Sequence, residues 1–209
     1  MRRYAFIDVA NTKGSANLLG FQIDPQRLYD YLCNEKWSCG EVFWYAGRIR
    51  NEKNEKAREK IERIGYKIQD KDTHFHKKHA HLEGACPKCG EPVVLDGRNH
   101  RMPKANCDVE LTIDALERAS PESEILLFTG DGDFHYLIKK LVEKGSRVRV
   151  FSTNKQDWDG SYRFSTRIKD LLSEYERSET RKKGEVTFTE LNNLRNRIGK
   201  EDGNEQVQV

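Results

Sequence analysis

Four aspartates have the residue type and setting needed for metal chemistry: Asp8, Asp108, Asp131 and Asp133. Carboxylates that lie within a few ångströms raise one another's pKa, so they stay ionised together only when a cation compensates their charge. Mg²⁺ and Mn²⁺ prefer such oxygen ligands and commonly leave positions for water and a substrate phosphate. Such ions can activate a water and stabilise the leaving oxygen of a phosphodiester. The acid set therefore predicts metal-dependent phosphodiester hydrolysis without a protein nucleophile.

The segments around these acids read as strands that alternate with helices. Asp8 closes the apolar run at its strand, and Asp131 and Asp133 follow the most apolar strand in a glycine-flanked turn. Short apolar and β-branched runs predict strands at 4–9, 41–46, 66–68, 125–128 and 147–151. Proline at the first helical position predicts one helix that starts at Asp24-Pro25. Apolar residues at helical spacing predict four more, over about 51–63, over 107–119, from the turn after 128 to 142, and over 165–175.

This alternation predicts an α/β fold in which a mainly parallel sheet of about five strands lies between two helical layers. In such a sheet ligands bind at the carboxyl ends of the strands, where the strand order reverses. With the order 3-2-1-4-5, the first and fourth strands are neighbours. Asp8 would then approach Asp131 and Asp133, and Asp108, at the start of its helix, would complete the site. A single aspartate after a strand is commonly a helix cap, but the glycine-flanked pair favours a site.

Two further side chains are candidates for substrate contacts. Asn11, three residues after Asp8, could hydrogen-bond a ligating carboxylate or the substrate. Lys104, four residues before Asp108, could contact a phosphate.

The region 72–103 interrupts the pattern and is rich in cysteine and histidine. Cys86 and Cys89, in Cys-Pro-Lys-Cys-Gly, have the spacing of half a zinc site. Since no second Cys-x-x-Cys exists, histidines are expected to complete a Cys₂His₂ structural Zn²⁺ site, and five are available: His74, His76, His79, His81 and His100. His79 and His100 flank the cysteines and are the preferred pair, although the residues do not decide among the five. The alternative is a surface loop with incidental cysteines.

The whole chain is expected to comprise one domain over 1–176, with the insertion 72–103, and a C-terminal part over 177–209. The C-terminal part reads as a basic linker, a short amphipathic helix that starts with a capping box at 187–190, and a disordered tail. No stretch is apolar enough to cross a bilayer, and the N-terminus lacks the pattern of a signal peptide. These features predict a cytoplasmic protein without a membrane partner. The net charge of +3 is weak, with a local basic cluster at 181–183 that suits a polyanion.

The motifs together resemble the NYN domain, and more narrowly its LabA-like branch within the PIN-like nucleases. The resemblance covers roughly 4–175 and is carried by Phe6-Ile7-Asp8 with Asn11, by the Lys104–Asp108 segment followed by Asp114, and by Thr129-Gly130-Asp131-Gly132-Asp133-Phe134. The Lys104–Asp108 segment is one residue longer than the family pattern. The resemblance implies a PIN-like α/β/α fold and Mg²⁺- or Mn²⁺-dependent endoribonuclease chemistry, with the four aspartates as metal ligands.

Three functions follow, in order of preference. The first is an endoribonuclease that hydrolyses RNA by a metal-activated water. The second is a non-catalytic RNA-binding or regulatory module, which the intact acid set disfavours. The third is a nuclease for DNA or a particular nucleic-acid structure, because carboxylates do not read a 2′-hydroxyl.

Overall fold

A six-stranded parallel sheet forms the centre of the protein. The computed structural model describes residues 1–78, 81–96, 100–158, 160–177 and 185–201, and within them the side chains outside 75–83 and 94–104. The strands run in the order β10-β9-β8-β1-β2-β3, and each neighbouring pair is parallel. Their bounds are β1 Arg2–Asp8, β2 Glu41–Arg48, β3 Lys67–Asp72, β8 Ser123–Phe128, β9 Arg147–Ser152 and β10 Val186–Glu190.

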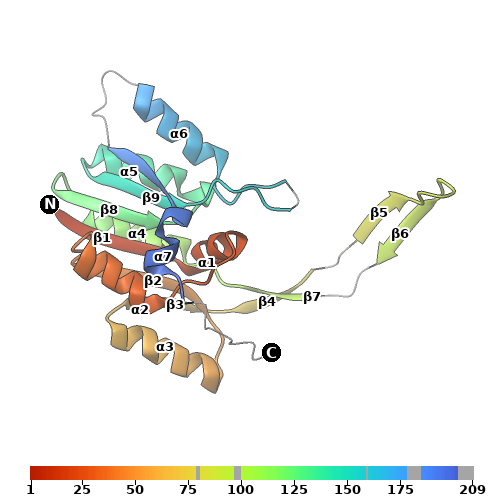
Figure 1. The fold of residues 1–209 in the computed structure, drawn as a ribbon, viewed down its shortest axis with the longest axis horizontal. Coiled ribbons are helices and arrows are strands. Elements are labelled where there is room, and N and C mark those ends of the chain that lie inside the picture. The colour runs from red at the N-terminus through yellow and green to blue at the C-terminus, as the bar shows by residue number, and fades with distance from the viewer. Residues whose placement is uncertain (79–80, 97–99, 159, 178–184, 202–209) are drawn as a thin grey trace, which may run out of the picture.

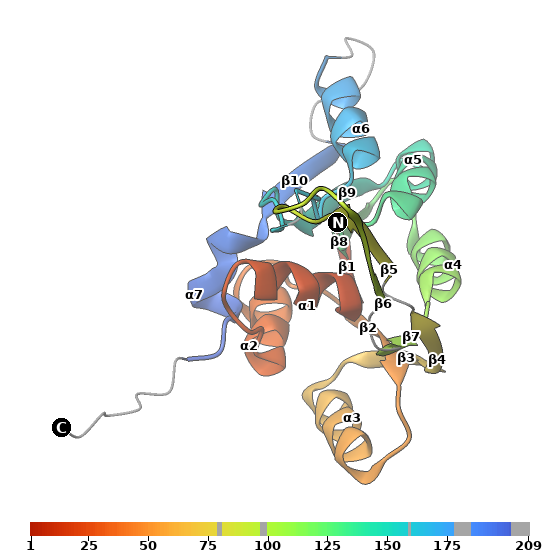
Figure 2. The ribbon, with the colours of Figure 1, turned by 90° about the vertical axis from the view of Figure 1, so that its right-hand side faces the viewer.

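Helices cover both faces of this sheet, as Figures 1 and 2 show. One face packs against α4 Asp108–Arg118, α5 His135–Glu143 and α6 Thr166–Arg177. The other packs against α1 Val9–Leu18, α2 Pro25–Asp30, α3 Glu52–Ile64 and α7 Arg195–Ile198, with a π-helical turn, η1 Tyr31–Glu35, and a 3₁₀ turn, η3 Leu191–Leu194. A second 3₁₀ turn, η2 Gly132–Phe134, precedes α5.

The two faces share the central strands, which explains why those strands are almost wholly apolar. In β8, Ile125 and Leu127 face the α4–α6 layer, whereas Leu126 and Phe128 face the α1–α2 layer. All four side chains are buried completely. A parallel strand covered on both sides reads as a continuous apolar run instead of an alternating one. The predicted three-layer α/β/α fold is therefore confirmed.

The predicted strand order is confirmed for five strands and is extended by a sixth. The expected order 3-2-1-4-5 corresponds to β3-β2-β1-β8-β9. The sixth strand, β10, corrects the expectation that a helix starts within 187–190. The sequence Val-Thr-Phe-Thr-Glu alternates apolar and polar residues, and its pairing with β9 satisfies its backbone groups. Glu190 then accepts a hydrogen bond from the backbone N–H of Asn192, so the acid caps the turn η3 and not a longer helix.

The insertion forms two antiparallel pairs of strands, of which β5 and β6 form a hairpin. β4 His74–Lys78 pairs with β7 His100–Lys104, and β5 His81–Ala85 pairs with β6 Pro92–Asp96. Figure 1 shows one pair of strands beyond the other, with β5 and β6 farthest from the sheet. Among the residues that the structure describes, no helix is both long and apolar enough to span a membrane.

Candidate active site

The carboxyl ends of β1 and β8 meet at one edge of the sheet and define the site. Ile7 pairs with Phe128, so Asp8 and the turn after β8 follow at the same level. The Thr12 hydroxyl of α1 lies 2.6 Å from the carbonyl oxygen of Asp8 and 3.0 Å from that of Phe128. One buried hydroxyl on α1 therefore holds the carboxyl ends of β1 and β8 together.

Hydrogen bonds then hold the Asp8 carboxylate between the two turns. Its Oδ1 accepts from the backbone N–H of Asn11 at 3.1 Å, and its Oδ2 accepts from the Thr129 hydroxyl at 3.1 Å. The side-chain oxygen of Asn11 accepts from the backbone N–H of Gly130 at 2.8 Å. Asn11 thus acts as a brace between the β1–α1 and β8–η2 turns, with its backbone N–H bonded to Asp8 and its side-chain oxygen bonded to Gly130.

The turn 129–133 positions the second pair of acids. Asp131 precedes η2, and its Oδ1 accepts from the backbone N–H of Asp133 at 3.0 Å. Gly130 is required because a Cβ there would lie 2.1 Å from the carbonyl oxygen of Arg163 and 2.4 Å from the hydroxyl of Ser152. The close packing that glycine permits brings Asp131 and Asp133 to the end of β8.

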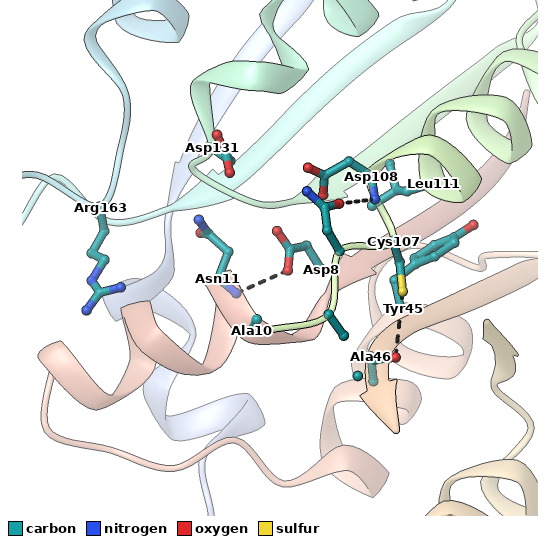
Figure 3. A pocket seen from close by; sticks show the side chains of 13 residues that line it. Asp8, Ala10, Asn11, Tyr45, Ala46, Cys107, Asp108, Leu111, Asp131 and Arg163 are labelled. Carbon is teal, nitrogen blue, oxygen red and sulfur yellow. Dashed lines mark hydrogen bonds between the residues drawn. The ribbon is translucent and has the colours of Figure 1, made fainter. Parts of the chain in front are cut away.

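Asp108 reaches the same place from the start of α4. Its backbone N–H donates to the side-chain oxygen of Asn106 at 2.8 Å. One carboxylate oxygen each from Asp108, Asp131 and Asp133 lie within 4.8 Å of one another, a spacing that suits one cation. Asp8 is outside this trio but lines the same cavity of about 280 Å³ with Asp108 and Asp131. Figure 3 shows these three side chains around one space.

The charges of this cavity are unbalanced. Burial raises the pKa of Asp8, against hydrogen bonds from Asn11 and Thr129 that lower it, and the negative charges of Asp108 and Asp131 raise it further. Burial also raises the pKa of Asp108, and the nearby Asp131 and Asp133 add to that rise while Asn106 opposes it. A bound divalent cation would relieve both effects, because it neutralises the carboxylates as a group.

The structure places two basic side chains near the acids, Arg163 and Lys71, that the sequence alone did not indicate. Arg163 lines the cavity opposite Asp108 (Figure 3). It also pairs with Asp157 at 3.3 Å. Lys71 pairs with Glu110 on α4 at 2.7 Å. Both lie in segments without a recognisable motif, so only the fold brings them to the site. Lys104 ends β7, and its side chain is outside the described part of the chain.

The floor of the cavity is fixed by contacts between β2 and α4. The Tyr45 hydroxyl donates to Asp114 at 2.8 Å, and burial raises the pKa of Tyr45 far above its usual range. The Cys107 thiol is buried and donates to the carbonyl oxygen of Ala46 at 3.6 Å. These contacts tie β2 to Cys107 at the start of α4 and to Asp114 farther along the same helix.

The two cysteines of the insertion lie at the end of the β5–β6 hairpin. Hydrogen bonds from the backbone N–H groups of Lys88 and Cys89, and from the Cys89 thiol, lower the pKa of Cys86. Of the preferred histidines, His79 lies outside the described residues, and His100 opens β7 with a side chain that is not described. Within the described side chains, the aspartate trio is the only cluster of three or more acidic, histidine or cysteine ligands.

Comparisons with known proteins agree with this architecture. The chain is 28% identical over 151 residues to the "Low amplitude and bright protein LabA" of Synechococcus elongatus, an alignment that covers 71% of this chain and 72% of the cyanobacterial one. Its fold is similar to the crystal structure of a Vibrio parahaemolyticus protein of unknown function, VPA0982, with a TM-score of 0.57 and 17% identity over 91% of this chain and 92% of the other. The NYN domain model matches residues 3–166. The chain therefore belongs to the NYN domain family.

Proposed function

We propose that the protein is an endoribonuclease that uses Mg²⁺ or Mn²⁺ to hydrolyse RNA phosphodiester bonds. The observation that carries this proposal is the convergence of carboxylate oxygens from Asp108, Asp131 and Asp133 within 4.8 Å, next to a cavity that Asp108 and Asp131 line together with Asp8. Membership in the NYN family supports the proposal. The motifs of the chain resemble the branch of that family that lies within the PIN-like nucleases.

The donor set fits a hard cation. All the acids offer carboxylate oxygens, which Mg²⁺ and Mn²⁺ prefer, and their number leaves positions for water and a phosphate. When bound, the ion would lower the pKa of a water and offset the charge of the scissile phosphate. Asp108, Asp131 and Asp133 are the proposed ligands, with Asp8 as the fourth.

The remaining side chains have positioning roles in this proposal. Thr129 and Asn11 fix the orientation of Asp8 through their hydrogen bonds, as supports of metal ligands usually do. Arg163 offers a guanidinium to a phosphate of the substrate from the opposite wall of the cavity. Lys104 remains a candidate for a second phosphate contact, since it precedes the loop 105–107 that lines the cavity. Zn²⁺ binding by Cys86 and Cys89 remains a separate structural proposal.

Cleavage assays with matched substrates test the assignment. Single-stranded RNA, hairpin RNA and DNA of the same sequences would be incubated with the full chain in Mn²⁺, Mg²⁺ or EDTA. The proposal expects cleavage of RNA with either metal and none in EDTA. Preferential cleavage of DNA would replace it with a DNA-directed nuclease. Failure to cleave any substrate, with RNA binding retained in a gel shift, would replace it with the non-catalytic module.

A further inference from the structure

The β5–β6 hairpin ends in a pre-formed turn that presents two thiols. The pair Ala85–Pro92 closes the ladder, and the backbone N–H of Cys86 donates to the carbonyl oxygen of Glu91 at 2.8 Å. Within the turn, the N–H of Gly90 donates to the carbonyl oxygen of Cys86 at 2.8 Å, and Gly90 has a φ of +77°, a conformation that favours glycine.

The turn places only two residues, Pro87 and Lys88, between the cysteines, which is the spacing of half a zinc site. Cys89 is exposed and Cys86 is half-buried, so an approaching ion meets both sulfurs from solvent. The turn is therefore arranged as two of the four ligands of a tetrahedral Zn²⁺ site.

Within the described part of the chain, no further ligand lies beside this turn. Five paired residues of β5, at about 3.3 Å each, separate Cys86 from the far end of the hairpin. His81 begins β5 and pairs with Asp96 at that far end, and His100 pairs with Lys78 in the next pair of strands, whereas Zn–S and Zn–N bonds are only about 2.0–2.3 Å long. The described side chains hold no third acidic, histidine or cysteine ligand beside the two sulfurs. Figure 1 also draws the turn as the part of the hairpin farthest from the sheet.

We propose that one Zn²⁺ joins the hairpin turns of two copies of this chain, with Cys86 and Cys89 of both copies as its four ligands. A two-fold axis through the ion satisfies such a site, because the same surface of each copy then meets itself. The turn lies farther from the sheet than any other strand that the structure describes, so two turns can meet while the two sheets stay apart.

Charge at the turn favours a second copy as the partner. Four thiolates around Zn²⁺ leave a net charge of −2 by simple addition. The only charged residue between the two cysteines is Lys88, and it is exposed. Two copies bring two such lysines, which balance the site. Each cysteine releases its proton when it binds the ion, so the dimer is expected to weaken as the pH falls.

This inference does not depend on the nuclease proposal, and the tests of the two are separate. The full chain would be prepared in a non-thiol reductant, with Zn²⁺ content, molar mass in solution and the Co²⁺ absorption spectrum measured together. The Asp131→Asn form would serve as the background, so that the acid site does not take up zinc. We expect one zinc for every two chains, a dimer that a chelator dissociates, and a Co²⁺ spectrum with intense thiolate charge-transfer bands and tetrahedral visible bands.

Variants separate the proposed site from its alternatives. In the Cys86→Ser/Cys89→Ser form, we expect loss of both the zinc and the dimer with an unchanged circular dichroism spectrum. His79→Ala and His100→Ala should keep both. Lys88→Glu should weaken zinc-linked dimerisation by about tenfold or more through like-charge repulsion, whereas Lys88→Arg should not. One zinc per monomer that is lost in a histidine variant, a dimer that survives chelation, or absence of zinc would each overturn the inference.

Discussion

The acid centre and the cysteine turn are both candidate metal sites, but they are built in opposite ways. Asp8 and the Thr129 hydroxyl that holds it are 121 positions apart in the sequence, and the sheet brings them together. Cys86 and Cys89 are held by a single turn, whose hydrogen bonds close between Cys86 and Glu91. The acid centre therefore depends on the whole fold, whereas the cysteine turn depends on its own hairpin and, in our proposal, on a second copy. Substitutions should separate these two kinds of dependence.

The largest effect is expected at the acid centre. Asp131→Asn removes the negative charge of one metal ligand and keeps the shape of the side chain. The metal should then lose several kcal/mol of its stabilisation of the transition state, and RNA cleavage should fall about a thousandfold. Single-turnover assays in Mn²⁺ would measure it. Glu122→Gln is the matched control, since this exposed acid precedes β8 at the opposite end of the strand. Equal activity of the two variants would refute the role of Asp131.

A smaller loss is expected when only the brace between the two turns is removed. Asn11→Ala deletes the acceptor for the Gly130 N–H and leaves every acid in place. Supports of this kind typically contribute about 10–100-fold to metal affinity or activity. Titration of activity with Mn²⁺ would locate the loss, and Asn17→Ala, an exposed asparagine on the same helix, is the control. An unchanged Mn²⁺ dependence would show that the acids need no brace.

The arginine at the cavity should contribute to substrate binding alone. Arg163→Gln is expected to raise KM about three- to fivefold, the range of an exposed ion pair, with kcat nearly unchanged. Arg147→Gln, at the start of β9 and so at the other edge of the sheet, should change neither constant. A fall in kcat with unchanged KM would instead place Arg163 against the reacting phosphate.

The raised pKa values predict an effect on stability. Because the pKa of Asp8 and of Asp108 is higher in the folded chain than in the unfolded one, their contribution is favourable below the ordinary pKa of 3.8 and is lost as the pH rises through the folded value. Asp108→Asn removes one of the two buried negative charges. At pH values where Asp108 is ionised in the folded chain, this variant should therefore have a higher melting temperature in EDTA than the wild type.

Scanning fluorimetry across pH would resolve this change, since about 1 kcal/mol corresponds to about 2–4 °C in a domain of this size. Mn²⁺ should stabilise the wild type more than Asp108→Asn. A lower melting temperature of the variant in EDTA would contradict the charge imbalance.

The smallest effect is expected from the cysteine turn. Cys86→Ser/Cys89→Ser should shift the melting temperature of the sheet domain by no more than about 2 °C, as other surface substitutions do, and should leave cleavage per chain unchanged. A larger fall would mean that the turn packs against the domain, contrary to its place in Figure 1.

The sequence predicted the elements whose signal is local and strong. The apolar runs of β1 and β8 and the glycine-flanked turn placed Asp8, Asp131 and Asp133 correctly, because a buried parallel strand leaves a continuous apolar pattern. The helix α1 was missed, because its residues Val9–Leu18 include Gly14 and show almost no apolar face. The strand β10 was taken for the start of a helix because threonine and glutamate at 187 and 190 match a capping box.

Contacts between distant segments were beyond sequence reasoning. The bond from Thr129 to Asp8 and the place of Arg163 in the cavity arise only when the sheet assembles. No motif around Thr129 or Arg163 indicates which residues either side chain will contact. Conversely, the spacing of Cys86 and Cys89 predicted half a metal site, but spacing alone could not show that β5 separates the cysteines from His81, which begins that strand.

Anomalous scattering from Mn²⁺ would test the acid centre most directly. Crystals of the chain soaked in Mn²⁺ should show an anomalous peak within coordination distance of carboxylate oxygens from Asp108, Asp131 and Asp133, with Asp8 adjacent, and the peak should disappear in Asp131→Asn crystals. An empty acid centre at Mn²⁺ concentrations that support cleavage, or a peak elsewhere that Asp131→Asn leaves in place, would contradict the proposal that these aspartates hold the catalytic metal.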